Sequence, residues 1–287
     1  MKAAISNIGG PKPTRSTGIM YSDMHKLIYC PIPKNATSYL RSVLLRNDPN
    51  TQDFDPVAET ALEYLTRKKF PAEVATREGT LRERRLLRSG DYTKIVALRD
   101  PAKRLVSCFL DKFAKANTRD EAQIERFCQD ASSVLGKRIT KDDLSFASFA
   151  GYVFKVPDWR SDRHYRSQAS YLRNIRFDHY FDVSEMTDLL AFLTNRGLNV
   201  TLPKTRNPSV DKKTPYSDED YDYTMKPAKF LTLGELRTMP AFPRYDAFFD
   251  DELTGGFEQR YQGDIDLFCS MKNVNRADYL KQLREQQ

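Results

Sequence analysis

The sequence predicts an α/β fold, a doubly wound parallel sheet flanked by helices within a single domain. Three observations support this prediction. Short apolar runs typical of buried strands alternate with segments whose apolar residues recur at helical spacing, and the strand-like runs end in polar loops. The 287 residues include 40% hydrophobic residues, enough to fill one sizeable core.

The first strand and helix follow a segment without any apolar period. Residues 1–20 contain several glycines and prolines and predict a flexible N-terminal arm, so the folded domain is expected over residues 21–287. The apolar run Lys26–Ile32 predicts a buried strand, and Ser38–Arg46 places its leucines and valine on one helical face.

A second strand and two further helices are predicted next. The apolar residues from Val57 to Leu65 are spaced as on a helix, and Lys94–Leu98 is a second strand-like run. Asp100 can cap the following helix, with Pro101 at its first position. That helix is expected to bury four apolar side chains, Leu105, Val106, Phe109 and Phe113.

The second half of the chain adds another strand and helix. His179–Val183 predicts a third strand, and Glu185–Arg196 predicts a helix that Gly197 closes in the left-handed conformation. Prolines and charges dominate Pro203–Pro243, which indicates a long loop or lid rather than a core element. Leu253–Phe268 carries its apolar residues on one helical face.

Composition restricts the partners and the compartment. The formal charge of +7 favours an anionic partner, and charge alone leaves open a nucleotide, an acidic glycan, a nucleic acid, a membrane surface or no ligand. No run approaches the roughly 18 apolar residues that cross a bilayer, and the N-terminus lacks the apolar centre of a signal peptide. We therefore expect a cytoplasmic protein without a transmembrane segment. The four scattered cysteines predict reduced thiols and no metal site.

The segment Pro33–Ser38 (PKNATS) lies where the first strand turns into the first helix. Such a junction aims backbone N–H groups and the positive end of the helix at one point, which makes an anion site. Lys34 adds a charge, and Thr37 and Ser38 add hydroxyl donors. A lysine in a turn before a helix can equally be an ordinary surface lysine, so this pattern alone does not decide.

A second polar segment begins at Arg99. This arginine leaves the carboxyl end of the second strand, where doubly wound sheets bind their ligands, and its guanidinium can fork onto a phosphate. On the following helix, Ser107 lies one turn beyond Lys103 and Arg104, so a hydroxyl and a cation can share an anion. The alternative is a capped helix with a charged, solvated face.

Together the two segments resemble the donor-binding signatures of sulfotransferases that use 3′-phosphoadenosine 5′-phosphosulfate, especially the carbohydrate sulfotransferase branch. IPKNATSYLR resembles that family's 5′-phosphosulfate loop, and VALRDPAKRLVSCFLDKF resembles its 3′-phosphate segment. The resemblance implies a P-loop-like sheet and transfer of a sulfuryl group to an acceptor hydroxyl, on a carbohydrate or glycolipid. Many members have a glycine in the first loop, where this chain has Asn35 and Ala36, so the loop must form without glycine's freedom.

The resemblance also implies which residues bind the donor. Lys34 would contact the oxygen that bridges phosphate and sulfur, and would be catalytic. Arg99 and Ser107 would hold the 3′-phosphate, and Arg206 in the long loop would contact the donor. One run of backbone N–H groups and hydroxyls would hold the 5′-phosphate: Asn35, Ala36, Thr37 and Ser38. A sulfuryl group in transfer carries less negative charge than a phosphoryl group, so no metal is expected.

His164 is the predicted general base. It lies in DRHYRSQ, which is similar to a His-x-x-x-Gln segment in parts of the family, and an imidazole pKa near ~6.5 suits a proton acceptor at neutral pH. A histidine that only fixes a loop is the alternative, and Asp162 could serve as the base instead. Four arginines lie close by in the sequence: Arg163, Arg166, Arg173 and Arg176. They leave open an anionic acceptor or a solvated basic face.

Other functions fit the sequence less well. A P-loop kinase needs GxxxxGK[ST], whereas Lys34 precedes a loop without glycine. A nucleic-acid-binding protein needs aromatic platforms or a basic recognition helix, and neither pattern is visible, so no nucleic acid is expected as a partner. A protein that binds the donor without turnover, and a trimmed luminal domain of a Golgi enzyme, both stay open. The sequence does not fix the acceptor or the oligomeric state.

Overall fold

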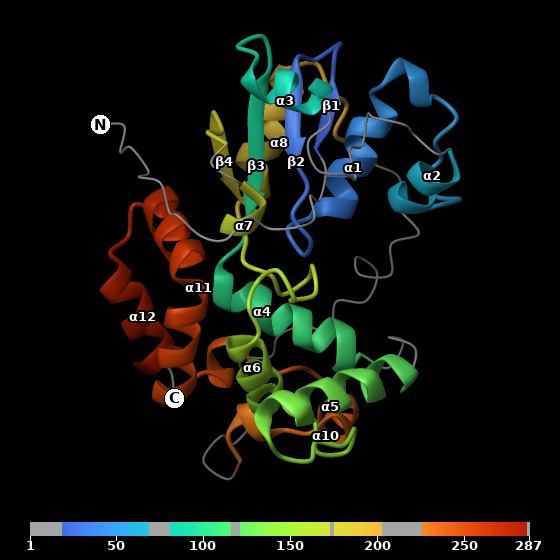
Figure 1. Cartoon of the computed structure of the whole chain (residues 1–287). Helices are drawn as coiled ribbons and strands as arrows, with labels where there is room; N and C mark the ends of the chain where they lie inside the picture. Colours follow the sequence, from blue (N-terminus) through green and yellow to red (C-terminus); the bar gives the residue numbers. More distant parts are fainter. Residues whose placement is uncertain (1–18, 69–80, 116–120, 173–174, 203–225, 286–287) are drawn as a thin grey trace. The chain divides into compact units, whose positions relative to one another are not determined.

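The structure, a computed structural model, describes residues 19–68, 81–115, 121–172, 175–202 and 226–285 (Figure 1). The chain divides into two compact units. The first, which we call the sheet unit, takes Met1–Arg99 and Ser167–Lys212, and the second, the helical unit, takes Asp100–Arg166 and Lys213–Gln287. The single domain over residues 21–287 stays a prediction. Of the expected arm, residues 1–18 lie outside the described part of the chain.

The sheet unit contains one four-stranded sheet, in which the strands follow their chain order. Its strands are β1 Met20–Ser22, β2 Leu27–Cys30, β3 Thr93–Leu98 and β4 His179–Asp182. β2, β3 and β4 are parallel, which confirms the three predicted strands, whereas β1 is antiparallel to β2. The sequence does not predict β1, because three residues are too few to show a period.

Helices bury both faces of this sheet. Successive side chains of β2 point to opposite faces, so Leu27 and Tyr29 join one apolar cluster and Ile28 joins another. The first cluster includes buried residues of α1 Thr37–Arg46, α2 Ala61–Arg67 and α8 Met186–Asn195. Leu86 and Leu87 of α3 Leu81–Arg88 pack against the second. The predicted α/β fold with helices flanking a largely parallel sheet is therefore confirmed (Figure 1).

Two helix boundaries in the sheet unit show how local sequence decides where a helix starts and ends. Thr60 and Glu63 form a capping box, so α2 begins at Ala61. The predicted start at Val57 is wrong, because Val57 precedes the cap and is 52% exposed. Gly197 has a φ of 81° just after α8, as predicted. The remaining short elements of the sheet unit are α7 Ala169–Leu172 and a 3-10 turn, Pro49–Thr51.

The helical unit is built around an aromatic core. The rings of Phe109, Phe146 and Phe149 lie within contact distance, with centroids of Phe109 and Phe149 5.4 Å apart. Its helices are α4 Pro101–Phe109, α5 Glu121–Leu135, α6 Phe146–Lys155, α10 Leu233–Thr238, α11 Asp251–Lys272 and α12 Arg276–Glu285. A π-helical turn, Leu110–Ala114, and two 3-10 turns, Ala228–Phe230 and Asp246–Phe248, complete it.

Most predictions for the helical unit are confirmed. The Asp100 side chain accepts the N–H of Lys103 at 2.9 Å and caps α4, with Pro101 at its start. The four apolar residues expected on this helix and just beyond it are all buried: Leu105, Val106, Phe109 and Phe113. The apolar face over Leu253–Phe268 lies on α11. All four cysteines are free and buried, as expected.

The long loop predicted over Pro203–Pro243 is wrong in its described half. Thr232 and Glu235 form a capping box that starts α10, and Leu233 and Leu236 are buried. Residues 203–225 lie outside the described part of the chain. Among the described helices, none combines the length and the apolar character that a membrane crossing requires.

Candidate active site

The first two site segments lie at the same edge of the sheet. β2 and β3 are parallel and pair Cys30 with Val96, so both strands end at this edge. The segment Pro33–Ser38, which we call the lysine loop, follows β2, and Arg99 follows β3. Nη1 of Arg99 donates a hydrogen bond to the backbone oxygen of Lys34 at 3.4 Å. The sheet therefore brings together Lys34 and Arg99, which are 65 residues apart in the sequence.

The lysine loop adopts left-handed backbone conformations without any glycine. Lys34 has a φ of 73° and Ala36 a φ of 53°. A left-handed residue other than glycine costs roughly 1–2 kcal/mol, because its Cβ crowds the following carbonyl oxygen. The loop thus forms this turn without glycine, in a strained form. Backbone strain of this kind is typical of functional turns.

Ala36→Gly is expected to raise the free energy of unfolding by up to ~1 kcal/mol, because relief of the left-handed strain exceeds the added entropy of the unfolded chain. Ala191→Gly is the matched control, since Ala191 is an exposed alanine inside α8. That variant should lose about 0.8–1 kcal/mol, the ordinary cost of glycine in a helix. Denaturant titration of both variants measures the difference. A destabilised Ala36→Gly variant would show that the loop is not strained at this residue.

The start of α1 offers N–H groups to an anion. Ala36 is the N-cap residue and provides no side-chain cap, and the first turn contains no acidic residue. The first N–H groups of a helix have no partner inside the helix, so those of Thr37 and Ser38 need an acceptor from elsewhere. The N–H of Asn35 donates to the oxygen of Ile32 at 3.2 Å, and the Thr37 hydroxyl donates to the same oxygen. The prediction that the N–H of Asn35 and the hydroxyl of Thr37 hold a phosphate is therefore wrong, because both donate within the loop. The N–H groups of Thr37 and Ser38 have the geometry for a phosphate at this helix terminus.

A buried amide network joins the lysine loop to Arg99. Nδ2 of Asn35 donates to the backbone oxygen of Ala97 at 2.9 Å and to Oε1 of Gln168 at 2.6 Å. Gln168 in turn accepts the backbone N–H of Arg99 and donates to its backbone oxygen. Sequence reasoning finds Gln168 only as the last residue of a His-x-x-x-Gln pattern. No periodicity signals a contact between residues 133 positions apart.

Ser107, the predicted contact for the 3′-phosphate, lies in the helical unit. It is partly buried on α4, which begins two residues after Arg99; the chain enters this unit at Asp100. The expectation that Arg104 shares the charged face with Ser107 is wrong. Arg104 is 2% exposed and donates to the backbone oxygen of Arg166 at 2.7 Å, while Lys103 lies 4.6 Å above the ring of Tyr245. Arg104 therefore helps to build the core of this unit.

His164 forms a dyad with Asp162 in the helical unit. Nδ1 of His164 lies 2.7 Å from Oδ1 of Asp162, and Nζ of Lys112 lies 3.0 Å from the same oxygen. Because a carboxylate accepts at Nδ1, neutral His164 carries its proton there and keeps Nε2 as a proton acceptor. Lys112 belongs to the π-helical turn Leu110–Ala114, and sequence reasoning does not connect it to His164. An imidazole that a carboxylate orients, and whose Nε2 can accept a proton, has the arrangement of a general base.

Burial sets the protonation of this dyad. It lowers the pKa of His164 below its usual value, and the charges of Lys112 and Arg163 lower it further, although Asp162 acts in the opposite direction. Burial also opposes ionisation of Asp162, but the hydrogen bond from His164 and the charge of Lys112 hold the pKa of that carboxyl well below its usual range. Neutral imidazole beside ionised carboxylate is therefore the state at neutral pH.

The pH profile follows from these directions. A base must be neutral to accept a proton, so the acid limb of kcat/KM is expected below about pH 6.5, the usual pKa of histidine, with a level rate above it. In Asp162→Asn the contribution that raises the pKa of His164 is lost, so the limb should move to lower pH. The profile of kcat/KM for both proteins measures this. A limb that moves upward in Asp162→Asn would contradict the assignment.

Arg206, the expected donor contact in the long loop, lies outside the described residues, so its role stays a prediction. The only tryptophan, Trp159, is 52% exposed and stacks near Arg160, with the guanidinium 5.7 Å from the ring centroid. Within the described ranges, no group of three or more histidine, cysteine or acidic side chains has the arrangement of a metal site.

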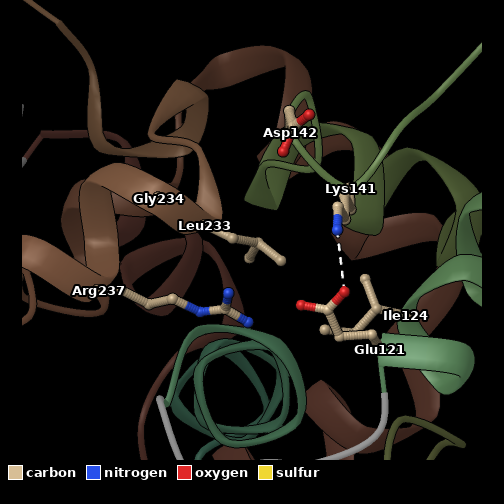
Figure 2. A pocket seen from close by; sticks show the side chains of 7 residues that line it. All are labelled: Glu121, Ile124, Lys141, Asp142, Leu233, Gly234 and Arg237. Atoms are coloured by element: carbon tan, nitrogen blue, oxygen red, sulfur yellow. Dashed lines mark hydrogen bonds and ion pairs between the residues drawn. The ribbon is translucent and has the colours of Figure 1, made fainter.

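The helical unit also has a surface pocket of about 180 Å³, whose lining includes none of the candidate residues. Figure 2 shows its lining, in which Lys141 forms an ion pair with Glu121 at 2.9 Å and Arg237 points toward the same space. Arg237 also donates to the backbone oxygen of Phe113 at 2.9 Å. The two basic side chains of the lining, Lys141 and Arg237, thus have partners within the protein.

Comparison with known proteins supports the resemblance. The sequence model of the sulfotransferase family matches residues 17–268. The chain is 29% identical to carbohydrate sulfotransferase 8 of Homo sapiens over 149 residues, which is 50% of this chain and 33% of that protein. It is 27% identical to carbohydrate sulfotransferase 10 of Gallus gallus over 139 residues, 47% of this chain and 37% of that protein.

A third relative matches a shorter stretch. The chain is 31% identical to carbohydrate sulfotransferase 9 of Homo sapiens over 105 residues, 35% of this chain and 21% of that protein. The matched stretches thus cover between 21% and 37% of these three relatives. No solved structure matches the chain.

Proposed function

The chain belongs to the sulfotransferase family, and from this premise we propose that it transfers a sulfuryl group from 3′-phosphoadenosine 5′-phosphosulfate to a hydroxyl group of a carbohydrate. The family match over residues 17–268 and the similarity to three carbohydrate sulfotransferases support the donor and the class of acceptor. One structural observation carries the proposal: the lysine loop and Arg99 lie at one sheet edge, joined by buried and part-buried hydrogen bonds.

The donor's two phosphate groups match this edge. Lys34 and the N–H groups at the start of α1, those of Thr37 and Ser38, provide positive potential for the 5′-phosphosulfate, and the Ser38 hydroxyl is a further contact. The Thr37 hydroxyl donates to Ile32 instead. Arg99, at the end of β3, provides a forked donor for the 3′-phosphate. Ser107 and Arg206 complete the proposed set, on the strength of the sequence resemblance. The backbone N–H of Ala36 belongs to the same set, while Asn35 acts through its buried amide.

Lys34 is the proposed catalytic cation. When bound, the donor supplies the sulfuryl group, and 3′-phosphoadenosine 5′-phosphate leaves as the bond between sulfur and the bridging oxygen breaks. That oxygen keeps the electron pair, and a fixed ammonium beside it stabilises the developing charge without reorganisation. Fixed cations and amide donors suffice for a group with little negative charge, so we propose that the reaction needs no metal.

His164 is the proposed base. Nε2 takes the proton of the acceptor hydroxyl as its oxygen forms the new bond to sulfur, and the resulting imidazolium is stabilised by the Asp162 carboxylate. Protons and electrons balance, because the hydroxyl loses its proton to the ring and the leaving phosphate keeps the electron pair. Lys112 holds Asp162 ionised and in place.

The alternative functions are not favoured. The family match covers most of the chain and is to sulfotransferases, and the lysine loop lacks the glycines of a kinase P-loop. The formal charge of +7 suits an anionic donor, so it does not call for a nucleic-acid partner.

An acidic carbohydrate would be a second anion beside the donor. Comparing the transfer rates to charged and neutral acceptors tests this directly.

Arg99→Ala is expected to weaken binding of 3′-phosphoadenosine 5′-phosphate by about 1.5–3 kcal/mol, the range for hydrogen bonds to charged groups. Isothermal titration calorimetry of the full chain measures the change in Kd. Arg46→Ala is the control, because Arg46 is an exposed arginine at the opposite end of α1. An Arg99→Ala variant that binds as tightly as the wild type would remove Arg99 from the donor site.

A further inference from the structure

The buried side chain of Gln168 links the two halves of the proposed donor site. We infer that Gln168 is a positioning residue, which fixes the lysine loop relative to the end of β3 so that Lys34 and Arg99 are spaced for one nucleotide. The inference rests on the proposed function. Gln168 is 1% exposed, so it acts through its neighbours rather than by touching the donor.

Three hydrogen bonds define what Gln168 holds. Its Oε1 accepts the backbone N–H of Arg99 at 3.1 Å, and its Nε2 donates to the backbone oxygen of Arg99 at 2.8 Å. The side-chain amide thereby pairs with the backbone of Arg99 on both sides, as a neighbouring strand would. The same Oε1 accepts Nδ2 of Asn35 at 2.6 Å. One side chain therefore fixes the strand end and the lysine loop together.

Asn35 provides the loop's side of this link. It is completely buried, and its Nδ2 donates to the oxygen of Ala97 on β3 as well as to Gln168. Oδ1 of Asn35 is buried and has no hydrogen-bond partner among the described residues. An unpaired buried carbonyl is unfavourable, so this orientation is kept because both hydrogens of Nδ2 are used for the link. The side-chain amide of Asn35 therefore serves to position the lysine loop.

The contacts close into a ring. Asn35 bonds to Gln168, Gln168 to Arg99, and Nη1 of Arg99 to the backbone oxygen of Lys34, which is covalently joined to Asn35. A closed ring restrains the loop more than separate contacts would, because no member can shift without breaking a bond to another. Binding groups act on both ends of a ligand only when their spacing is fixed beforehand. The ring supplies that spacing for the two cations.

Only an amide can make this link. A carboxylate in place of Gln168 could accept but would face the backbone oxygen of Arg99 without a proton to donate. A methionine has similar length but neither donates nor accepts strongly, which leaves Asn35 and the backbone of Arg99 unpaired in a buried place. Gln168→Met therefore removes the link while filling its volume.

Calorimetry with 3′-phosphoadenosine 5′-phosphate tests the inference on the full chain. Gln168→Met is expected to raise Kd at least ~10-fold, since small misplacements of binding groups have large effects. Asn35→Ala should raise it similarly, and it is the second variant if Gln168→Met folds poorly. In an Arg99→Ala background, Gln168→Met should have a much smaller effect, because residues that act through one another are not additive.

Asn47→Ala is the matched control. Asn47 is an amide in the sheet unit that also makes three hydrogen bonds, to Val43 and to both backbone groups of Asn199, at the other end of α1. These bonds are part-buried or exposed, so the variant should lower the Tm by less than Gln168→Met does, and it should leave Kd unchanged. The inference would be overturned if Gln168→Met and Asn35→Ala both kept the wild-type Kd. It would also be overturned if Gln168→Met raised Kd as much in the Arg99→Ala background as in the wild type. A wild-type chain that binds no nucleotide would instead overturn the proposed function.

Discussion

Lys34→Ala is expected to reduce kcat by about 10²–10³-fold or more, to the limit of detection, while the chain still folds and binds 3′-phosphoadenosine 5′-phosphate. The ammonium stabilises charge that appears on the bridging oxygen only as the bond to sulfur breaks. The product nucleotide lacks the sulfuryl group, so it keeps its phosphate contacts with the α1 terminus and Arg99. The loss should therefore appear in kcat far more than in Kd.

Lys26→Ala is the matched control for this prediction. Lys26 also has a positive φ, of 47°, and precedes β2 rather than following it. Its Nζ lies 5.2 Å from the centroid of the Tyr92 ring, so the substitution removes a lysine and a contact without touching the sheet edge. Single-turnover transfer assays of both variants measure the difference. A Lys34→Ala enzyme that transfers sulfuryl at the normal rate would contradict the mechanism.

His164→Ala is expected to lower kcat by about 10²–10⁴-fold with the Kd for 3′-phosphoadenosine 5′-phosphate unchanged. The reason is that Nε2 accepts the acceptor's proton in the transition state and makes no proposed contact with the nucleotide. His179→Ala is the control, because His179 is exposed on β4. Steady-state transfer assays measure kcat, and calorimetry of nucleotide binding measures Kd.

The competing base is Asp162, and the structure argues against it. Its carboxyl accepts from His164 and pairs with Lys112, and its lowered pKa makes it a weak proton acceptor at neutral pH. If Asp162 were the base, His164→Ala would keep most of its turnover and Asp162→Asn would lose it all. Unchanged turnover in His164→Ala would move the base elsewhere.

Local patterns predict strands and helices in both units where consecutive residues encode each element. The apolar run around Leu27 is buried on both faces of β2. Asp100 as the N-cap and Pro101 as the first helical residue together mark the start of α4. Where the pattern is short, the prediction fails. β1 has three residues, and the helix expected from Val57 begins only at Ala61, where the cap forms.

The candidate site could be predicted only as separate segments. Lys34 and Arg99 are placed correctly because each follows a strand, and parallel strands end at the same edge. The contacts that join them depend on Gln168, 69 residues beyond Arg99, and no local rule relates such positions. Lys112 and Asp162 likewise meet only through the fold. Arg104, which the pattern places on a charged face, is buried because a backbone oxygen accepts its hydrogen bond.

In the proposed mechanism, the lysine loop and Arg99 bind opposite ends of one nucleotide. Calorimetric titration of the full chain with 3′-phosphoadenosine 5′-phosphate, and in parallel with adenosine 5′-phosphate, tests this arrangement. We expect saturable binding of one molecule per chain, and much weaker binding of the nucleotide that lacks the 3′-phosphate. If well-folded protein gave no heat of binding, or bound the two nucleotides with equal affinity, the proposed arrangement would be wrong.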